Sequence, residues 1–150
     1  MPKTVGKMSE ESISREEFIE KLNYDLEWEY AAAIQYIQHQ AVISGAAYDN
    51  IADELAIHAE EELQHAIQLA DQIEYLGGTP SVDVEDVKIS EDAETMLEQD
   101  LEGERDAIER YKKRIRQAEA LDEYATAQTI RDILVTEQEH EMDLMDALDL

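Results

Sequence analysis

The stretch that decides the fold runs from residue 51 to residue 76 and reads IADELAIHAEEELQHAIQLADQIEYL. At helical spacing it places one continuous, mostly apolar stripe on a single face. Glu62 and His65 lie inside that stripe, where a packed helix carries apolar side chains. A buried carboxylate costs several kcal/mol unless it is paired or bound to a metal, and a Glu and a His three residues apart can bind one ion. The stretch therefore predicts a metal-binding helix.

The same arrangement recurs 75 residues later, where Glu137 and His140 interrupt a second apolar stripe. A helix upstream of each motif carries one more Glu in its own stripe. These residues are Glu29 and Glu104, each 33 residues before the Glu of its motif. The chain therefore reads as two copies of one helical hairpin, each supplying a lone Glu and a Glu-x-x-His motif.

Chance alone explains some of these matches, because a chain with 38 acidic residues places some Glu three positions before a His by accident. The other two histidines, His39 and His58, lack the motif. His58 lies on the same stripe one turn before Glu62, and we expect it to be a core histidine rather than part of a third metal site. The alternative to a metal site is a set of solvated glutamates and two core histidines. Under this alternative it would be a coincidence that the motifs share their position in the apolar stripe, their spacing and the 75-residue repeat.

The charge of the motifs indicates what they bind. Four carboxylates carry −4, so with neutral imidazoles they balance two divalent cations. Oxygen ligands alone suit calcium or magnesium, whereas two imidazoles move the preference toward iron, manganese or zinc. We therefore expect a pair of metal ions bridged by carboxylates.

From about residue 22 to residue 148 the chain resembles bacterioferritin, within the ferritin-like di-iron carboxylate proteins. The matching segments are LNYDLEWEYAAAIQYIQH at 22–39, EELQHA at 61–66, LGGTP at 76–80, MLEQDLEGE at 96–104 and EQEH at 137–140. The resemblance implies an all-α fold, a ferritin-like four-helix bundle with one long crossover between helices two and three. It also implies that the two metals are iron, with manganese or zinc as substitutes.

The resemblance assigns roles to individual residues. It implies six metal ligands: Glu29, Glu62, His65, Glu104, Glu137 and His140. Glu29 and His65 would be terminal on one metal, Glu104 and His140 terminal on the other, and the remaining two glutamates bridging. Bacterioferritins keep a tyrosine beside the metals at the place of Tyr36, which makes Tyr36 the candidate catalytic residue. Tyr111 holds the matching place in the second hairpin, where we expect core packing.

Two departures from bacterioferritin change what is expected. Heme-binding members carry a Met directly after the Glu of the second-helix motif, and here that position is Leu63, so heme is not expected. Only ten residues follow His140, and they are needed to finish the fourth helix. A fifth helix is therefore not expected, and among homo-oligomers we rank a dodecamer first, a dimer second and a 24-mer third.

Composition excludes several other classes. A net charge of −26 disfavours a nucleic-acid partner, because a strongly acidic surface repels phosphate. The absence of cysteine excludes disulfides and thiolate metal sites. No apolar run reaches membrane-spanning length and no signal peptide is recognised, so we expect a cytoplasmic protein with no membrane partner.

The boundaries of the elements follow from caps and breakers. Residues 1–13 are polar and expected to be flexible, and residues 14–150 are expected to form the bundle. Ser14-Arg-Glu-Glu17 is a capping box that starts the first helix. The predicted helices span residues 15–44, 48–76, 91–119 and 123–148, with the crossover at 77–90.

Three functions compete at this stage. The leading one is a ferroxidase that oxidises Fe2+ to Fe3+ with O2 or H2O2 for iron storage or detoxification. The second is a non-storage di-iron oxidase or peroxidase, either rubrerythrin-like or a Dps-like oxidative-stress protein. Rubrerythrins carry an extra Glu three residues after the third-helix ligand, and here that place is Ala107. The third is a purely structural bundle, which the six buried polar residues disfavour.

Overall fold

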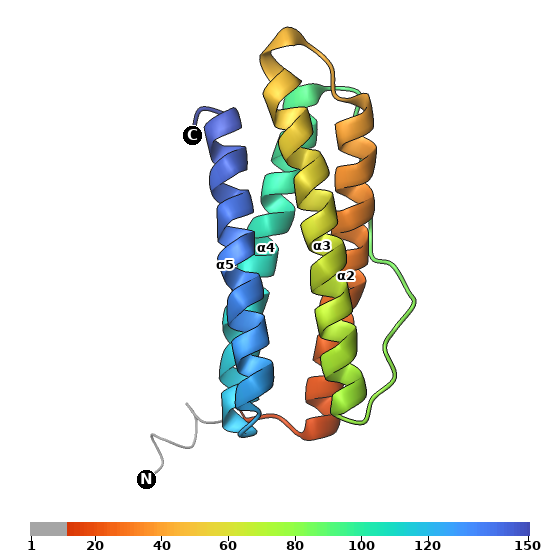
Figure 1. Ribbon diagram of the computed structural model, residues 1–150, viewed down its shortest axis with the longest axis vertical. Coiled ribbons are helices and arrows are strands. Elements are labelled where there is room, and N and C mark those ends of the chain that lie inside the picture. Colours follow the sequence, from red (N-terminus) through yellow and green to blue (C-terminus); the bar gives the residue numbers. More distant parts are fainter. Residues whose placement is uncertain (1–11) are drawn as a thin grey trace.

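A computed structural model describes residues 12–150 as four long helices that lie side by side along the long axis of the molecule (Figure 1). The elements are α2 (Arg15–Val42), the short 3-10 turn η1 (Ala46–Tyr48), α3 (Asp49–Tyr75), α4 (Ala93–Ala120) and α5 (Tyr124–Ala147). The described residues contain no β-strand, which confirms the all-α prediction. Residues 1–11 of the predicted flexible segment lie outside the described part of the chain, while Ile13 packs against the core.

The helix ends have local causes. The Ser14 hydroxyl accepts a hydrogen bond from the Glu17 backbone N–H at 3.1 Å, and the Glu17 carboxylate accepts one from the Ser14 N–H, so the predicted capping box starts α2. Asp92 caps α4 by accepting from the Thr95 N–H at 2.9 Å. The first helix ends at Val42, two residues before the predicted end, and Gly45 takes φ = 113° in the turn that follows. All other predicted helix ends lie within two residues of the observed ones.

The two hairpins are joined by the long connection between α3 and α4, residues 76–92, which runs along the outer side of α2 (Figure 1). Side chains of α2 hold this crossover in place. The Tyr30 hydroxyl donates to the Ser81 carbonyl at 2.9 Å, and His39 Nε2 lies 2.9 Å from the Lys88 carbonyl oxygen. The connection is thereby fixed against the bundle, as the predicted single long crossover requires.

Two buried pairs of polar side chains link the hairpins, and they follow the same 75-residue repeat. Asp25 of α2 receives two hydrogen bonds from the Arg114 guanidinium of α4, from Nε at 2.7 Å and from Nη2 at 3.0 Å. In the matching pair, Asp100 Oδ2 of α4 lies 2.9 Å from His39 Nδ1 of α2. Both carboxylates are buried, and each partner comes from the other half of the chain. The pairs therefore fix α2 against α4 at two levels.

No helix within residues 12–150 is both long enough and apolar enough to cross a membrane.

Two glycines give a matched test of the packing. A Cβ at Gly78 would stand 2.5 Å from Ile19 Cγ2 and 3.1 Å from Ile73 Cγ2, whereas a Cβ at Gly103 within α4 would meet no atom within 4 Å. Gly78→Ala should lower the free energy of unfolding by about 1–3 kcal/mol through overpacking. Gly103→Ala should raise it by about 0.5–1 kcal/mol, because alanine is the better helix former. Urea denaturation measures both, and equal effects of the two substitutions would contradict this packing.

Candidate metal centre

All six predicted ligands come together in the middle of the bundle. Glu29 comes from α2, Glu104 from α4, and the two Glu-x-x-His motifs from α3 and α5. Each of the six side chains belongs to a residue that is at most 4% exposed. The ionisable groups therefore occupy the core itself and not a solvated face.

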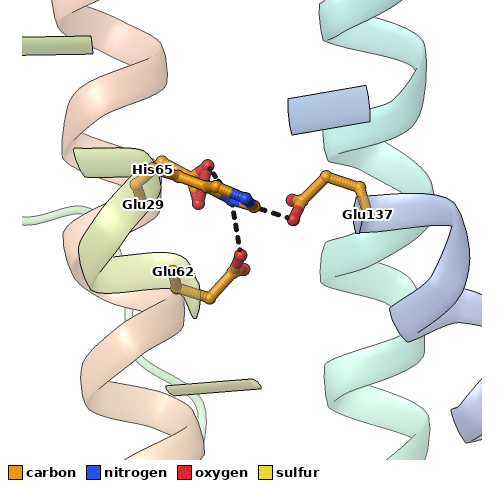
Figure 2. A group of neighbouring side chains, drawn as sticks. All are labelled: Glu29, Glu62, His65 and Glu137. Carbon is orange, nitrogen blue, oxygen red and sulfur yellow. Dashed lines mark ion pairs between the residues drawn. The ribbon is translucent and has the colours of Figure 1, made fainter. Parts of the chain in front are cut away.

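One group of four side chains surrounds His65. Its Nδ1 atom lies 3.0 Å from Glu62 Oε1, 3.3 Å from Glu137 Oε1 and 3.4 Å from Glu29 Oε2. Figure 2 shows the carboxylates of α2 and α3 approaching this ring from one side and Glu137 of α5 approaching from the other. Three helices thus aim oxygen and nitrogen atoms at one point.

A second group of four surrounds His140. Its Nδ1 atom lies 3.0 Å from Glu104 Oε2, 3.7 Å from Glu137 Oε1 and 3.8 Å from Glu62 Oε1. In each group one ligand-type atom from every residue lies within 4.8 Å of the others. Glu62 and Glu137 belong to both groups, so the arrangement offers two adjacent metal positions with two shared carboxylates.

The donor atoms fit a metal better than they fit one another. Four of them are buried without a hydrogen-bond partner: Glu62 Oε1, His65 Nδ1, Glu104 Oε1 and Glu137 Oε1. Their short separations are therefore not aligned as hydrogen bonds, although buried polar atoms are almost always bonded. Ligand atoms about 2.0–2.2 Å from a common ion stand about 3 Å apart, which is the spacing seen around His65.

Burial and the close approach of like charges shift the pKa values of the ligand-type side chains. Burial, reinforced by the nearby charge of Glu137, raises the pKa of Glu62 well above its usual range and that of Glu104 to about 7. Burial disfavours the charged form of His65, but contacts with Glu137 and Glu29 outweigh it and raise the pKa of that imidazole to about 10. Burial also disfavours the charged form of His140, but its contact with Glu104 outweighs this effect and raises its pKa to about 9. Without metal the core therefore retains protons at neutral pH.

Two tyrosines cross between the hairpins. The Tyr36 hydroxyl donates to Glu104 Oε2 at 2.5 Å, and the Tyr111 hydroxyl donates to Glu29 Oε2 at 2.7 Å. Both residues are buried, as predicted, and each hydroxyl contacts the lone glutamate of the opposite half. For Tyr111 the sequence favoured core packing over a hydrogen-bonding role, and the structure shows that it has both. The repeat that pairs Tyr111 with Tyr36 was the signal that could have found the hydrogen bond.

Glu61 was also missed as a functional residue. Its Oε1 atom lies 3.0 Å from His140 Nε2, so it holds the nitrogen that faces away from Glu104. A carboxylate on the outer nitrogen fixes the ring orientation and raises its basicity. Because Glu61 and His140 lie on different helices, no sequence spacing indicates this contact.

A pocket of about 60 Å³ connects this core to the surface between α2, α4 and the crossover. The carboxylates of Glu29, Glu62, Glu104 and Glu137 line its inner end. Small residues of α2 and α4 leave it open: Ala31, Ala32, Gly103 and Ala107. The pocket has room for water-sized molecules and ends at the candidate centre.

The raised pKa values predict that metal binding releases protons. With these pKa values and no metal bound, His65 and His140 are imidazolium ions at pH 7, and each ring must lose its second proton to coordinate an ion. Binding of Zn2+ at pH 7 should therefore release at least two protons per chain, and the affinity should fall as the pH falls. Titration calorimetry in buffers of different ionisation enthalpy measures the number. A release near zero would contradict the protonation described here.

Comparison with known proteins identifies a matching family and several relatives. The family described as Ferritin-like domain matches residues 19–150. A bacterioferritin of Brucella melitensis biotype 1 is 32% identical over 133 residues, which cover 88% of this chain and 83% of that protein. A DNA protection during starvation protein of Halobacterium salinarum is 31% identical over 131 residues, covering 80% of this chain and 71% of that protein.

Two solved structures of ferritin-related proteins are also similar to this chain. One is described as a ferritin like, diiron-carboxylate protein from Bacillus anthracis str. Ames, with a TM-score of 0.87, 35% identity, and coverage of 91% of this chain and 99% of that one. A second is a dodecameric thioferritin, the bacterioferritin-related protein from Bacteroides fragilis, with a TM-score of 0.84, 33% identity, and coverage of 91% and 87%. The bundle, the crossover and the matched residues together show that this chain belongs to the ferritin-like domain family.

Proposed function

We propose that this chain is a ferroxidase that oxidises Fe2+ to Fe3+ at a carboxylate-bridged di-iron centre and contributes to iron storage and detoxification. The observation that carries the proposal is the pair of buried four-residue groups that share Glu62 and Glu137. Relatives described as bacterioferritin and bacterial ferritin support iron as the metal. The donor set of carboxylates and imidazoles would also accept manganese or zinc as substitutes.

The six residues divide into terminal and bridging ligands. We assign Glu29 and His65 to one ion, and Glu104 and His140 to the other. The two carboxylates common to both groups would bridge the ions. Each bound Fe2+ would supply one electron, so that the pair delivers the two electrons that reduce O2 to peroxide or peroxide to water.

The chain itself supplies positions, protons and restricted access. Tyr36 and Tyr111 hold the lone carboxylates of the opposite hairpins, and Glu61 holds the outer nitrogen of His140. The pocket between α2 and α4 admits a molecule of the size of O2 or H2O2. Tyr36 is our candidate catalytic residue, because its hydroxyl can give a proton or an electron directly beside Glu104 Oε2.

A second function has specific support. A non-storage di-iron oxidase or peroxidase, rubrerythrin-like or Dps-like, would use the same centre without retaining iron. One relative is described as a DNA protection during starvation protein. Ala107 stands where rubrerythrins carry an additional Glu, which favours the Dps-like form of this alternative. In either case we expect no heme, since Leu63 replaces the family's heme-ligating Met.

Iron titration separates the two functions. Fe2+ is added to apoprotein in air, and separately to apoprotein with anaerobic H2O2, while ferric absorbance and retained iron are followed. Retention far beyond two irons per chain supports storage, and saturation near two with continued turnover supports the alternative. Glu62→Ala and Glu137→Ala should abolish binding of both metals, whereas Glu60→Ala, an exposed control on α3, should not. Unchanged binding of the second metal in either bridging variant would overturn the assignment of bridges.

Paired tyrosine variants test the role of Tyr36. A hydrogen bond to a charged group is worth about 1.5–3 kcal/mol, so one that matters mainly in the transition state changes the rate about ten- to a hundredfold. Tyr36→Phe should slow oxidation by that range while two metals still bind. Tyr111→Phe removes the equivalent hydrogen bond from Glu29 and should slow oxidation less. Stopped-flow absorbance measures both rates, and equal slowing would reassign Tyr36 to carboxylate positioning.

The storage function requires a closed shell, which light scattering tests. We expect a dodecamer, as described for the thioferritin of Bacteroides fragilis, in preference to a dimer or a 24-mer. Twelve chains of 17.2 kDa have a mass of about 206 kDa. Higher salt should favour assembly, because chains of net charge −26 repel one another. A mass near that of a dimer at every ionic strength would rule out a closed shell, and with it the storage part of the proposed function.

A further inference from the structure

A third group of metal-type ligands lies outside the centre described above. His58 of α3 is 1% exposed, and its Nε2 atom lies 3.0 Å from Asp143 Oδ2 of α5. Glu54 stands one turn before His58 on α3. One ligand-type atom from each of these three residues lies within 4.8 Å of the others. The group thus combines one buried imidazole with two carboxylates that reach solvent.

The repeat shows that the bundle does not need polar groups here. The residue 75 positions after His58 is Ile133, which is equally buried. The counterparts of Glu54 and Asp143 are Thr129 and Gln68. The other half of the molecule therefore packs the same place with an apolar side chain and leaves it without charge.

His58 is also incompletely satisfied. Its Nδ1 atom is buried and has no hydrogen-bond partner among the described residues. An unpaired buried polar atom is unfavourable, and Ile133 avoids it at the matching position. A buried imidazole with a carboxylate directly at its Nε2 atom offers the donors of a metal site, and the matching half shows that packing alone does not require them.

The group lies directly beside the candidate di-metal centre. The His58 ring is stacked on the ring of His140, with centroids 3.9 Å apart and planes 24° apart. The Tyr36 ring meets His58 edge-on, with centroids 5.0 Å apart. Glu54, His58 and Asp143 belong to α3 and α5, whereas the pocket opens between α2, α4 and the crossover. The two features therefore approach the centre from different pairs of helices.

We propose that Glu54, His58 and Asp143 bind a third divalent transition-metal cation next to the di-iron centre. Two carboxylates and one neutral imidazole balance the charge of such an ion, and this mixed donor set suits Fe2+, Mn2+ or Zn2+ better than calcium. Two ligand atoms about 2.0–2.1 Å from one ion stand about 3.0–3.4 Å apart, in agreement with the 3.0 Å between His58 Nε2 and Asp143 Oδ2.

The exposure of the carboxylates indicates how the site works. Glu54 is exposed and the Asp143 side chain is 42% exposed, so water completes the coordination and the ion can exchange with solvent. The site therefore binds a cation transiently between solvent and the buried centre, on the side of α3 and α5. The identification of this cation as Fe2+ rests on the proposed function. The ability of the site to bind a divalent cation does not depend on that function.

Anomalous diffraction from crystals of the assembled protein soaked in Co2+, an air-stable substitute for Fe2+, tests the proposal. We expect three cobalt peaks per chain, one of them bonded to His58 and Asp143. Two peaks at the centre without the third would overturn this proposal and leave the ferroxidase proposal standing. A cobalt peak at His58 without the two peaks at the centre would overturn the ferroxidase proposal and leave the third-site proposal standing.

A variant built from the repeat provides the test in solution. Glu54→Thr combined with Asp143→Gln installs the residues that the other half already carries, so the fold should be kept. Bound Co2+ should fall from three per chain to two. The control, Asp53→Asn with Asp146→Asn, removes the same charge from exposed positions of the same helices and should keep three. Wild-type protein that saturates at two, or a Thr/Gln variant that still binds three, would overturn the proposal.

Discussion

The structure depends on the burial of four carboxylates and two imidazoles in the core of a helical bundle. Charges in such a place are unstable alone, and their mutual contacts leave four donor atoms without hydrogen bonds. Bound protons can offset part of this cost, since the pKa values of Glu62, His65 and His140 are all raised. Two cations would replace those protons and neutralise the carboxylates, so metal binding and folding stability are coupled.

A repeated hairpin explains how one chain builds a site of this kind. The buried pairs Asp25–Arg114 and Asp100–His39 fix the two halves at matching levels. The tyrosines then cross from each half to the lone glutamate of the other. Because the repeat supplies most of the centre twice, departures from it mark what is specific to one half. Glu61 has Thr136 as its counterpart, and His58 has Ile133.

The sequence predicts the fold and the six candidate ligands because both depend on spacing within helices. Stripes, caps and the 75-residue repeat are visible without coordinates. Contacts between helices are not visible in this way. Glu61 meets His140, and Asp143 meets His58, across sequence separations of 79 and 85 residues with no motif to connect them. The first helix was predicted to run to residue 44, directly before Gly45, but it ends at Val42 because the backbone of Ile43 is already extended.

The central claim is that two irons bind as one bridged pair, and Mössbauer spectroscopy tests it most directly. Apoprotein receives two equivalents of 57Fe2+ per chain in air and is frozen, one equivalent for each four-residue group. A bridged pair predicts ferric ions whose spins cancel, with no magnetic splitting in a weak applied field. A magnetically split spectrum of isolated high-spin ferric ions, or saturation at one iron per chain, would contradict the account.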